Sequence, residues 1–181
     1  MTPAIWLVTG AQGAGKSAVA DLLARAFERG VHVRGGQFYR WAPRGWVHFD
    51  DPLQPEEARR LLSLRYRLSA VVALEYVAAG FTCVVQDNIY GPDVTTWLGL
   101  TDAWPRHLVV LRPSVTALTA REAARRLTTG KIAYRGGYTP AANDAAVGTT
   151  SAIGLWLDTS QHSPAETVAE ILNRSDEALV V

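Results

Sequence analysis

The chain has little cysteine, methionine and lysine, and it lacks a long apolar run. Among its 181 residues there is one methionine and one cysteine, Cys83. A single cysteine excludes an intrachain disulfide and a cysteine-based zinc site, and it suits a reducing compartment, so we expect a cytoplasmic protein. No apolar run approaches the roughly 20 residues that a membrane span requires. The first residues lack the charged segment and cleavage site of a signal peptide.

Net charge is also almost absent, at +1 for the whole chain. This balance gives no basic surface of the kind that binds nucleic acid or an anionic membrane. An apolar content of 48% and a charged content of 19% are ordinary for a globular protein. We therefore expect a single domain over residues 1–181, a monomer or homodimer, with no nucleic-acid or membrane partner.

Lysine is scarce, with two residues against sixteen arginines, and the first lysine ends a glycine-rich motif. Residues 10–17 fit the pattern G-x-x-x-x-G-K-S, after an apolar run and before a helical pattern. This strand–turn–helix context is that of a phosphate-binding P-loop, in which backbone N–H groups surround a polyphosphate at a helix N-terminus. The predicted nucleotide-binding residues are Gly10, Ala11, Gln12, Gly13, Ala14, Gly15, Lys16, Ser17 and Ala18. Lys16 is expected to reach the β- and γ-phosphates and Ser17 to bind Mg²⁺. The alternative is a glycine-rich turn that binds nothing.

Apolar segments alternate with helical patterns along the rest of the chain. Strands are expected near residues 5–10, 31–34, 81–87, 107–112 and 153–158, with helices between them. Such alternation predicts an α/β fold with one parallel sheet covered on both faces. Residues 163–166 form a capping box for a closing helix over 165–173, and residues 175–181 are expected to fray.

A long helix is predicted from an acidic turn at residues 50–57 to about Ala79. Leu61, Leu64, Leu68, Val71, Val72, Glu75 and Tyr76 mark one side of this helix. Arg65 and Arg67 are expected on the surface of this helix, and contact with an anionic acceptor is the alternative.

Two carboxylates stand where strands end, and ligands bind at that edge of an open parallel sheet. Asp87 follows the third strand, and we predict that it is catalytic and lies near Mg²⁺ or the attacking hydroxyl. A turn or helix cap is the alternative for Asp87. Asp158 follows the fifth strand, where a structural role is expected.

Arginines gather on the fourth helix, before a segment that contains glycine. We expect a mobile lid around residues 121–138, in which Arg121 contacts nucleotide while Arg125 and Arg126 are catalytic, because phosphoryl transfer needs cations on the transferring group. Lys131 and Arg135 belong to the same segment. A solvated helix face is the alternative.

Aromatic residues cluster after the second and third strands and predict a pocket for an organic acceptor, with core packing as the alternative. They are Tyr39, Trp41, Trp46, Tyr90 and Trp97. His48, Asp50 and Asp51 are candidate bases if their loop folds inward.

Five motifs in order make the chain similar to small P-loop kinases. They are G-x-x-G-x-G-K-S, then His-Val-Arg-Gly, Val-Val-Gln-Asp, Arg-Glu-Ala-Ala-Arg-Arg and Leu-Asp-Thr-Ser. Within these kinases the chain most resembles the chloramphenicol phosphotransferase-like proteins and related bacterial ATP-binding phosphotransferases, and it is more distantly similar to gluconate, shikimate and adenylylsulfate kinases. The resemblance extends from Ile5 to about Leu172.

This resemblance implies a five-stranded sheet of order 2-3-1-4-5, MgATP on the P-loop, and γ-phosphoryl transfer to a hydroxyl. It implies that Lys16 and Ser17 bind phosphate and Mg²⁺ and that Asp87 is the acid after the third strand. The chain departs from the family at Gly35-Gly36, where relatives have a Gly-Asp step whose aspartate contacts the acceptor hydroxyl. Another base, an acceptor that needs none, or a protein that binds nucleotide without efficient transfer would each account for this departure.

The expected function is therefore ATP-dependent phosphorylation of a hydroxyl on a small organic molecule, such as an antibiotic or another natural product. The alternative is a nucleotide-binding resistance or regulatory protein that sequesters a ligand. A nucleoside or nucleotide kinase is a third reading, which the scarcity of basic residues in 37–58 does not favour.

Overall fold

A computed structural model describes residues 2–130, 134 and 138–180 of the chain. The strands are β1 (Ile5–Gly10), β2 (Gly30–Arg34), β3 (Thr82–Gln86), β4 (Arg106–Leu111), β5 (Leu155–Leu157) and β6 (Leu179–Val180). The helices are α1 (Lys16–Arg25), α2 (Gln37–Trp41), α3 (Pro55–Ala78), α4 (Pro92–Gly99), α5 (Val115–Thr129), α6 (Pro140–Gly148), α7 (Pro164–Asn173) and α8 (Ser175–Ala178).

In this part of the chain the strands form one sheet, with β2, β3, β1, β4 and β5 parallel and in that order. The α/β class and the order 2-3-1-4-5 are therefore confirmed. One addition was missed: β6 pairs antiparallel with β4, so the described sheet has six strands and not five. The segment expected to fray instead forms α8 and β6, because the buried Ala178 and the pairing of His107 with Leu179 tie it to the sheet.

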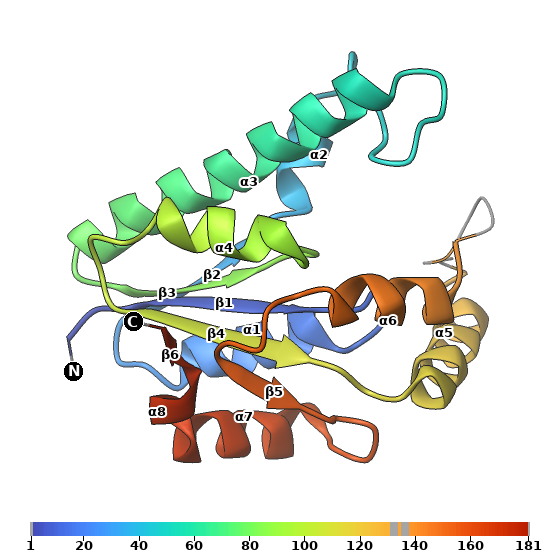
Figure 1. Ribbon diagram of the computed structural model, residues 1–181. Helices are drawn as coiled ribbons and strands as arrows, with labels where there is room; N and C mark the ends of the chain where they lie inside the picture. Colours follow the sequence, from blue (N-terminus) through green and yellow to red (C-terminus); the bar gives the residue numbers. More distant parts are fainter. Residues whose placement is uncertain (1, 131–133, 135–137, 181) are drawn as a thin grey trace.

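The helices form layers on the two faces of the sheet (Figure 1). Helices α3 and α4 cover one face, whereas α1, α7 and α8 lie on the other. Strand β1 is buried along its whole length, as a central parallel strand should be. Helices α5 and α6 lie beyond the carboxyl ends of the strands, so they face the edge at which ligands bind.

Local signals set several helix boundaries correctly. Helix α3 starts with Pro55 and has Glu56 and Glu57 in its first turn, where proline geometry and negative charge both favour a helix start. The predicted capping box of α7 is present, since the Ser163 hydroxyl accepts from the Glu166 N–H and the Glu166 carboxylate accepts from the Ser163 N–H.

The side of α3 that the apolar pattern marks is only partly buried. Leu68, Val71 and Tyr76 are exposed, and the buried side carries small and polar residues. Its members are Ala58, Leu61, Arg65, Ser69, Ala70, Ala73 and Val77. The apolar pattern and the buried side share Leu61 but otherwise differ, because this helix approaches the sheet largely through alanines and directs Arg65 towards the site.

No helix in the described residues combines the length and the apolar character needed to cross a membrane.

Candidate active site

The glycine-rich loop joins β1 to α1 and forms the floor of the candidate site. Gly10, Gly13 and Gly15 all have positive φ angles, of 135°, 86° and 94°. A Cβ at Gly10 would overlap the carbonyl oxygen of Leu111. The backbone path of the loop therefore depends on glycine, and α1 begins immediately after it at Lys16.

Lys16 lies inside this loop with only 6% of its surface exposed. Its Nζ donates to the carbonyl oxygens of Gly10 and Ala11, at 2.8 Å each. Burial, followed by the positive charges of Arg65 and Arg125, lowers the pKa of Lys16 to about 7. An anion bound in the loop would restore the charged form, as phosphate binding by this lysine requires.

Ser17 occupies the first turn of α1, and its hydroxyl donates to Gln86 Oε1 at 3.0 Å. Magnesium in kinase sites is held by few protein oxygens, together with phosphate oxygens and water. A hydroxyl at this position with an amide oxygen beside it fits such a site. The described residues contain no group of three or more His, Cys, Asp or Glu side chains arranged to hold a metal without the nucleotide.

A cavity of about 490 Å³ opens above the loop, and we call it the donor cavity. Its walls are Gln12, Gly13, Gly15, Lys16, Ser17, Ala18, Gln86, Asn88, Arg121, Glu122 and Arg125. The predicted nucleotide-binding residues Gly10, Ala11 and Ala14 shape the loop without lining this cavity. Their roles, like those of the lining residues, stay predictions.

The three predicted arginines of α5 have different surroundings. Arg121 donates to the carbonyl oxygen of Ala14 at 3.3 Å and to that of Thr159, so it ties the loop to the segment after β5. Arg125 lines the donor cavity and pairs with Glu122 at 2.6 Å. Arg126 lines a separate hollow beside Leu127. Most of the predicted lid beyond Thr129, including Lys131 and Arg135, lies outside the described residues.

Asp87 follows β3, as predicted, but its carboxylate is already engaged. Both oxygens accept from the Arg65 guanidinium, with Nε at 2.9 Å from Oδ2, and Oδ1 also accepts from the Asn88 N–H at 2.7 Å. The side chains of Asp87 and Arg65 are 2% and 7% exposed. The expectation of a surface Arg65 is wrong, because the guanidinium is buried against the carboxylate and lies 4.5 Å from the Tyr39 ring centroid. The metal role of Asp87 stays a prediction.

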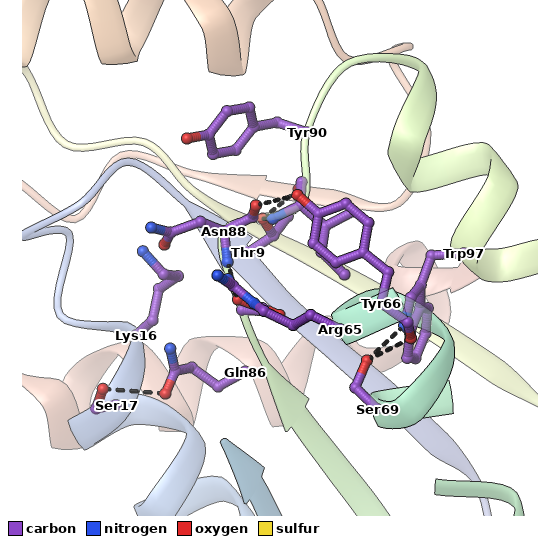
Figure 2. Close-up of polar contacts among 12 residues, drawn as sticks. Thr9, Lys16, Ser17, Arg65, Tyr66, Ser69, Gln86, Asn88, Tyr90 and Trp97 are labelled. Atoms are coloured by element: carbon purple, nitrogen blue, oxygen red, sulfur yellow. Dashed lines mark hydrogen bonds and ion pairs between the residues drawn. The ribbon is translucent and has the colours of Figure 1, made fainter. Parts of the chain in front are cut away.

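A second cavity of about 380 Å³ lies beside the first, and we call it the acceptor cavity. Its lining includes Gly36, Tyr39, His48, Phe49, Asp50, Arg65, Asp87 and Tyr138. Gln12, Gln86 and Asn88 line both cavities and form their common wall. Figure 2 shows the side chains of Lys16, Gln86 and Asn88 around the same space.

The predicted aromatic residues divide between this cavity and the rest of the molecule. Tyr39 lines it, and Trp46 packs against Tyr39 with ring centroids 4.0 Å apart. Trp97 is fully buried and donates to Ser69 at 2.9 Å, so it belongs to the core. Trp41 is 67% exposed.

Sequence reasoning missed the residues that fix the common wall. The Gln12 N–H donates to Oδ1 of Asn143 at 2.6 Å, and the Gln12 carbonyl accepts from the Tyr134 hydroxyl. Asn143 is fully buried and also donates to the hydroxyls of Tyr90 and Tyr138. A polar residue at or just beyond the end of a strand was a usable signal for Gln86 and Asn88. Nothing in the sequence around Asn143 indicates a partner 131 positions earlier.

The segment after β3 is held from two sides, which places Asp87 and Asn88. Tyr66 donates its hydroxyl to the Asn88 carbonyl at 2.9 Å (Figure 2). The Thr9 hydroxyl donates to the Ile89 carbonyl, and the Ile89 N–H donates back to Thr9 Oγ1 at 3.2 Å. The end of β1 and the end of β3 are thereby locked together at the ligand-binding edge.

Solved structures share this whole architecture. The chain superposes on the Mycobacterium tuberculosis APS kinase in complex with AMPPNP and APS with a TM-score of 0.68 and 17% identity, over 96% of this chain and 97% of that one. A sugar kinase from Janibacter sp. matches with a TM-score of 0.63 and 17% identity, over 98% and 96% of the two chains. The Deinococcus radiodurans tunicamycin resistance protein matches with a TM-score of 0.62 and 14% identity, over 100% and 99%.

The chain has the fold of the P-loop kinases. No protein-family profile matches the sequence, and neither does any curated protein. At these identities the structural likeness establishes the fold and leaves the activity to be argued from the site.

Proposed function

We propose that this protein is an ATP-dependent phosphotransferase that moves the γ-phosphoryl group to a hydroxyl of a small organic molecule. The observation that carries the proposal is the pair of adjoining cavities, one over the P-loop and one beside it, with Gln12, Gln86 and Asn88 in both walls. A shared wall lets a phosphate donor and an acceptor meet without either entering the other's site, which is the positioning that phosphoryl transfer needs.

Each part of the donor cavity has a task in this proposal. Backbone N–H groups of the loop and the Lys16 ammonium hold the phosphates, and α1 directs its N-terminus at the same place. Arg121 and Arg125 line the opposite side and offset negative charge on the transferring group. Ser17 would hold Mg²⁺, which supplies charge neutralisation between the phosphates.

Asp87 has a supporting task on the acceptor side. In its ion pair with Arg65 the two buried charges neutralise each other. The pair also fixes the wall in which Asn88 stands, because the Asp87 carboxylate accepts from the Asn88 N–H. The acceptor would be a natural product, and the likeness to a tunicamycin resistance protein supports including antibiotics in the search.

The test begins with nucleotide binding and then measures transfer. We expect the protein to bind AMPPNP, and to transfer phosphate from [γ-³²P]ATP to at least one of glycerol, glucose, gluconate, adenosine, chloramphenicol and tunicamycin, with hydrolysis by water measured as the background. Lys16→Ala should remove both properties, since it deletes the cation inside the loop. Unchanged AMPPNP affinity in Lys16→Ala, or no transfer by the wild-type protein to any acceptor, contradicts the proposal.

A second candidate function is sequestration of a ligand without efficient transfer, and Gly36 is the observation that favours it. Gly36 lines the acceptor cavity, at the position where the resemblance to small P-loop kinases implies a carboxylate. Its φ of −61° suits any residue, and a Cβ there would meet nothing within 4 Å. Gly36→Asp therefore introduces the missing acid without strain. A large gain in transfer by Gly36→Asp would favour sequestration by the natural protein, and little or no gain favours a natural phosphotransferase.

A further inference from the structure

We infer that His48, held by Asp50, is the general base that takes the proton from the acceptor hydroxyl. This inference rests on the proposed function and answers the question that Gly36 raises. It assigns the task of the missing aspartate to a loop that lies between α2 and α3 in the sequence.

The other groups that line the acceptor cavity are poor bases. Asp87 is the nearest carboxylate to the common wall, but both of its oxygens accept from Arg65 and one also accepts from a backbone N–H. Proton uptake by Asp87 would leave the guanidinium buried without a counter-charge, which is costly. The amides of Gln12, Gln86 and Asn88 do not take up protons near neutral pH.

The two residues that follow β2, Gly35 and Gly36, bring no carboxylate to the cavity. A Cβ on Gly35 would collide with the Asp87 carboxylate, so this position accepts no side chain while the ion pair is present. Gly36 has space for a side chain but carries none. Among the carboxylates and imidazoles of the described lining this leaves His48 and Asp50 as the groups from which a base can be chosen.

The geometry of these two residues is that of an oriented imidazole. His48 Nδ1 contacts Asp50 Oδ1, and a carboxylate at Nδ1 favours the tautomer that carries its proton there and leaves Nε2 as the acceptor. The His48 ring also packs against Phe49, with centroids 4.5 Å apart. The Asp51 N–H donates to the His48 carbonyl at 3.1 Å, which closes the turn beneath the pair.

The loop is anchored to the opposite wall of the cavity. Phe49 meets the Tyr138 ring edge-on, with centroids 6.1 Å apart. Tyr138 accepts from Asn143 at 2.9 Å, and Asn143 holds the backbone of Gln12. One chain of contacts therefore leads from the His48 loop to the P-loop, so the proposed base and the donor cavity belong to one assembly.

The step balances with ATP as the donor. The acceptor oxygen forms a bond to the γ-phosphorus while the bond from that phosphorus to the bridging oxygen breaks, and ADP leaves with the bonding electrons. The hydroxyl proton passes to Nε2 of His48. Because the His48 side chain is 63% exposed, the imidazolium can return this proton to solvent after each turnover.

The experiment compares His48→Ala and His48→Gln with the wild-type protein, using the acceptor from the panel above that gives the fastest transfer. We expect kcat to fall about 100-fold, the low end of what a general base contributes. AMPPNP affinity and the KM for ATP should change less than about threefold. Added imidazole should restore transfer in His48→Ala by about tenfold or more, because a merely structural histidine is not replaced by a free base.

Neighbouring aspartates supply a matched control. Asp50→Asn removes the negative charge at Nδ1 and should lower kcat about tenfold. Asp51→Asn makes the same change one residue later, at a carboxylate that accepts from the Leu53 N–H at 2.8 Å and does not line the cavity, and it should leave kcat within about twofold.

The possible outcomes distinguish a failure of the role of His48 from a failure of the proposed phosphotransferase function. Full transfer by His48→Ala, or a loss in both His48 variants that imidazole does not restore, overturns the role of His48 and leaves the phosphotransferase proposal intact. A wild-type protein that binds AMPPNP and transfers phosphate to no acceptor of the panel overturns the proposed function, and the role of His48 with it.

Discussion

The donor cavity and the acceptor cavity share a wall, yet they draw on the chain in different ways. The donor cavity takes most of its lining from one short segment around Gly10–Ser17, and glycines at positive φ set the backbone shape of that segment. The acceptor cavity collects side chains from segments as distant as Gly36, His48, Arg65, Asp87 and Tyr138. Phosphate is recognised by a local backbone shape, whereas an organic acceptor needs side chains that only the tertiary fold brings together.

The largest expected effect concerns the buried ion pair on the acceptor side. Asp87→Ala leaves the Arg65 charge buried without a partner, and we expect the free energy of unfolding to fall by about 3–5 kcal/mol. Urea denaturation followed by circular dichroism measures this change.

An exposed pair is the control for Asp87→Ala. Arg112 and Asp144 form a similar contact at 2.8 Å, but their side chains are 40% and 22% exposed. Asp144→Ala should therefore cost less than about 1 kcal/mol. Equal losses in the two variants would show that burial does not distinguish the acceptor-side pair from a surface pair.

Two adjacent glycines give the next effect. Gly35→Ala places a Cβ against the Asp87 carboxylate, and overpacking of this kind costs about 1–3 kcal/mol. Gly36→Ala meets open space and should stay within about 0.5 kcal/mol of the wild-type protein. Urea denaturation of both variants measures the contrast.

A double variant tests the cause of the Gly35 effect. In the Asp87→Ala background the carboxylate is gone, so Gly35→Ala should lose much of its cost, giving a coupling of about 1 kcal/mol. Strict additivity of the two changes would mean that Gly35 is required for another reason.

The difference between local and tertiary contacts also decides which parts of the fold and of the candidate site could be predicted from the sequence. The glycine-rich loop and the capping box of α7 depend on local patterns, and the sheet order was implied by the resemblance to small P-loop kinases; the structure has all three. The burial of Arg65 could not be read from its position, because a helix with leucines on one side looks as if that side faces the core. Its guanidinium is buried since Asp87, 22 residues later, supplies a counter-charge that only the fold brings near.

The same reason limits the prediction of the acceptor cavity. His48 and Asp50 were recognisable as acid–base candidates, but whether they reach the cavity depends on how their loop folds, which the sequence pattern does not determine. Asn143 gave no signal at all, since its role is to satisfy a backbone N–H of Gln12 from a distant helix. Trp97 was a reasonable pocket candidate by position and is instead a core residue with its N–H bonded to Ser69.

The last expected effect lies on the donor side and concerns a proton. In the free protein the pKa of Lys16 is lowered to about 7 by burial and then by the charges of Arg65 and Arg125. A bound phosphate raises that pKa again, because it favours the charged amine. Between the free and bound pKa values, binding must therefore take up a proton, and affinity should fall by up to tenfold for each pH unit above about 7.

Titration calorimetry with MgADP at pH 8, in buffers of different ionisation enthalpy, measures this uptake directly, since MgADP is fully deprotonated there. We expect close to one proton per nucleotide. Ser17→Ala should weaken binding but keep the same uptake, because the hydroxyl does not titrate in this range. Identical heats in every buffer would mean that Lys16 is already charged in the free loop. In that case the lysine of the donor cavity would carry its charge before nucleotide binds. The donor cavity would then need no change of protonation to bind phosphate.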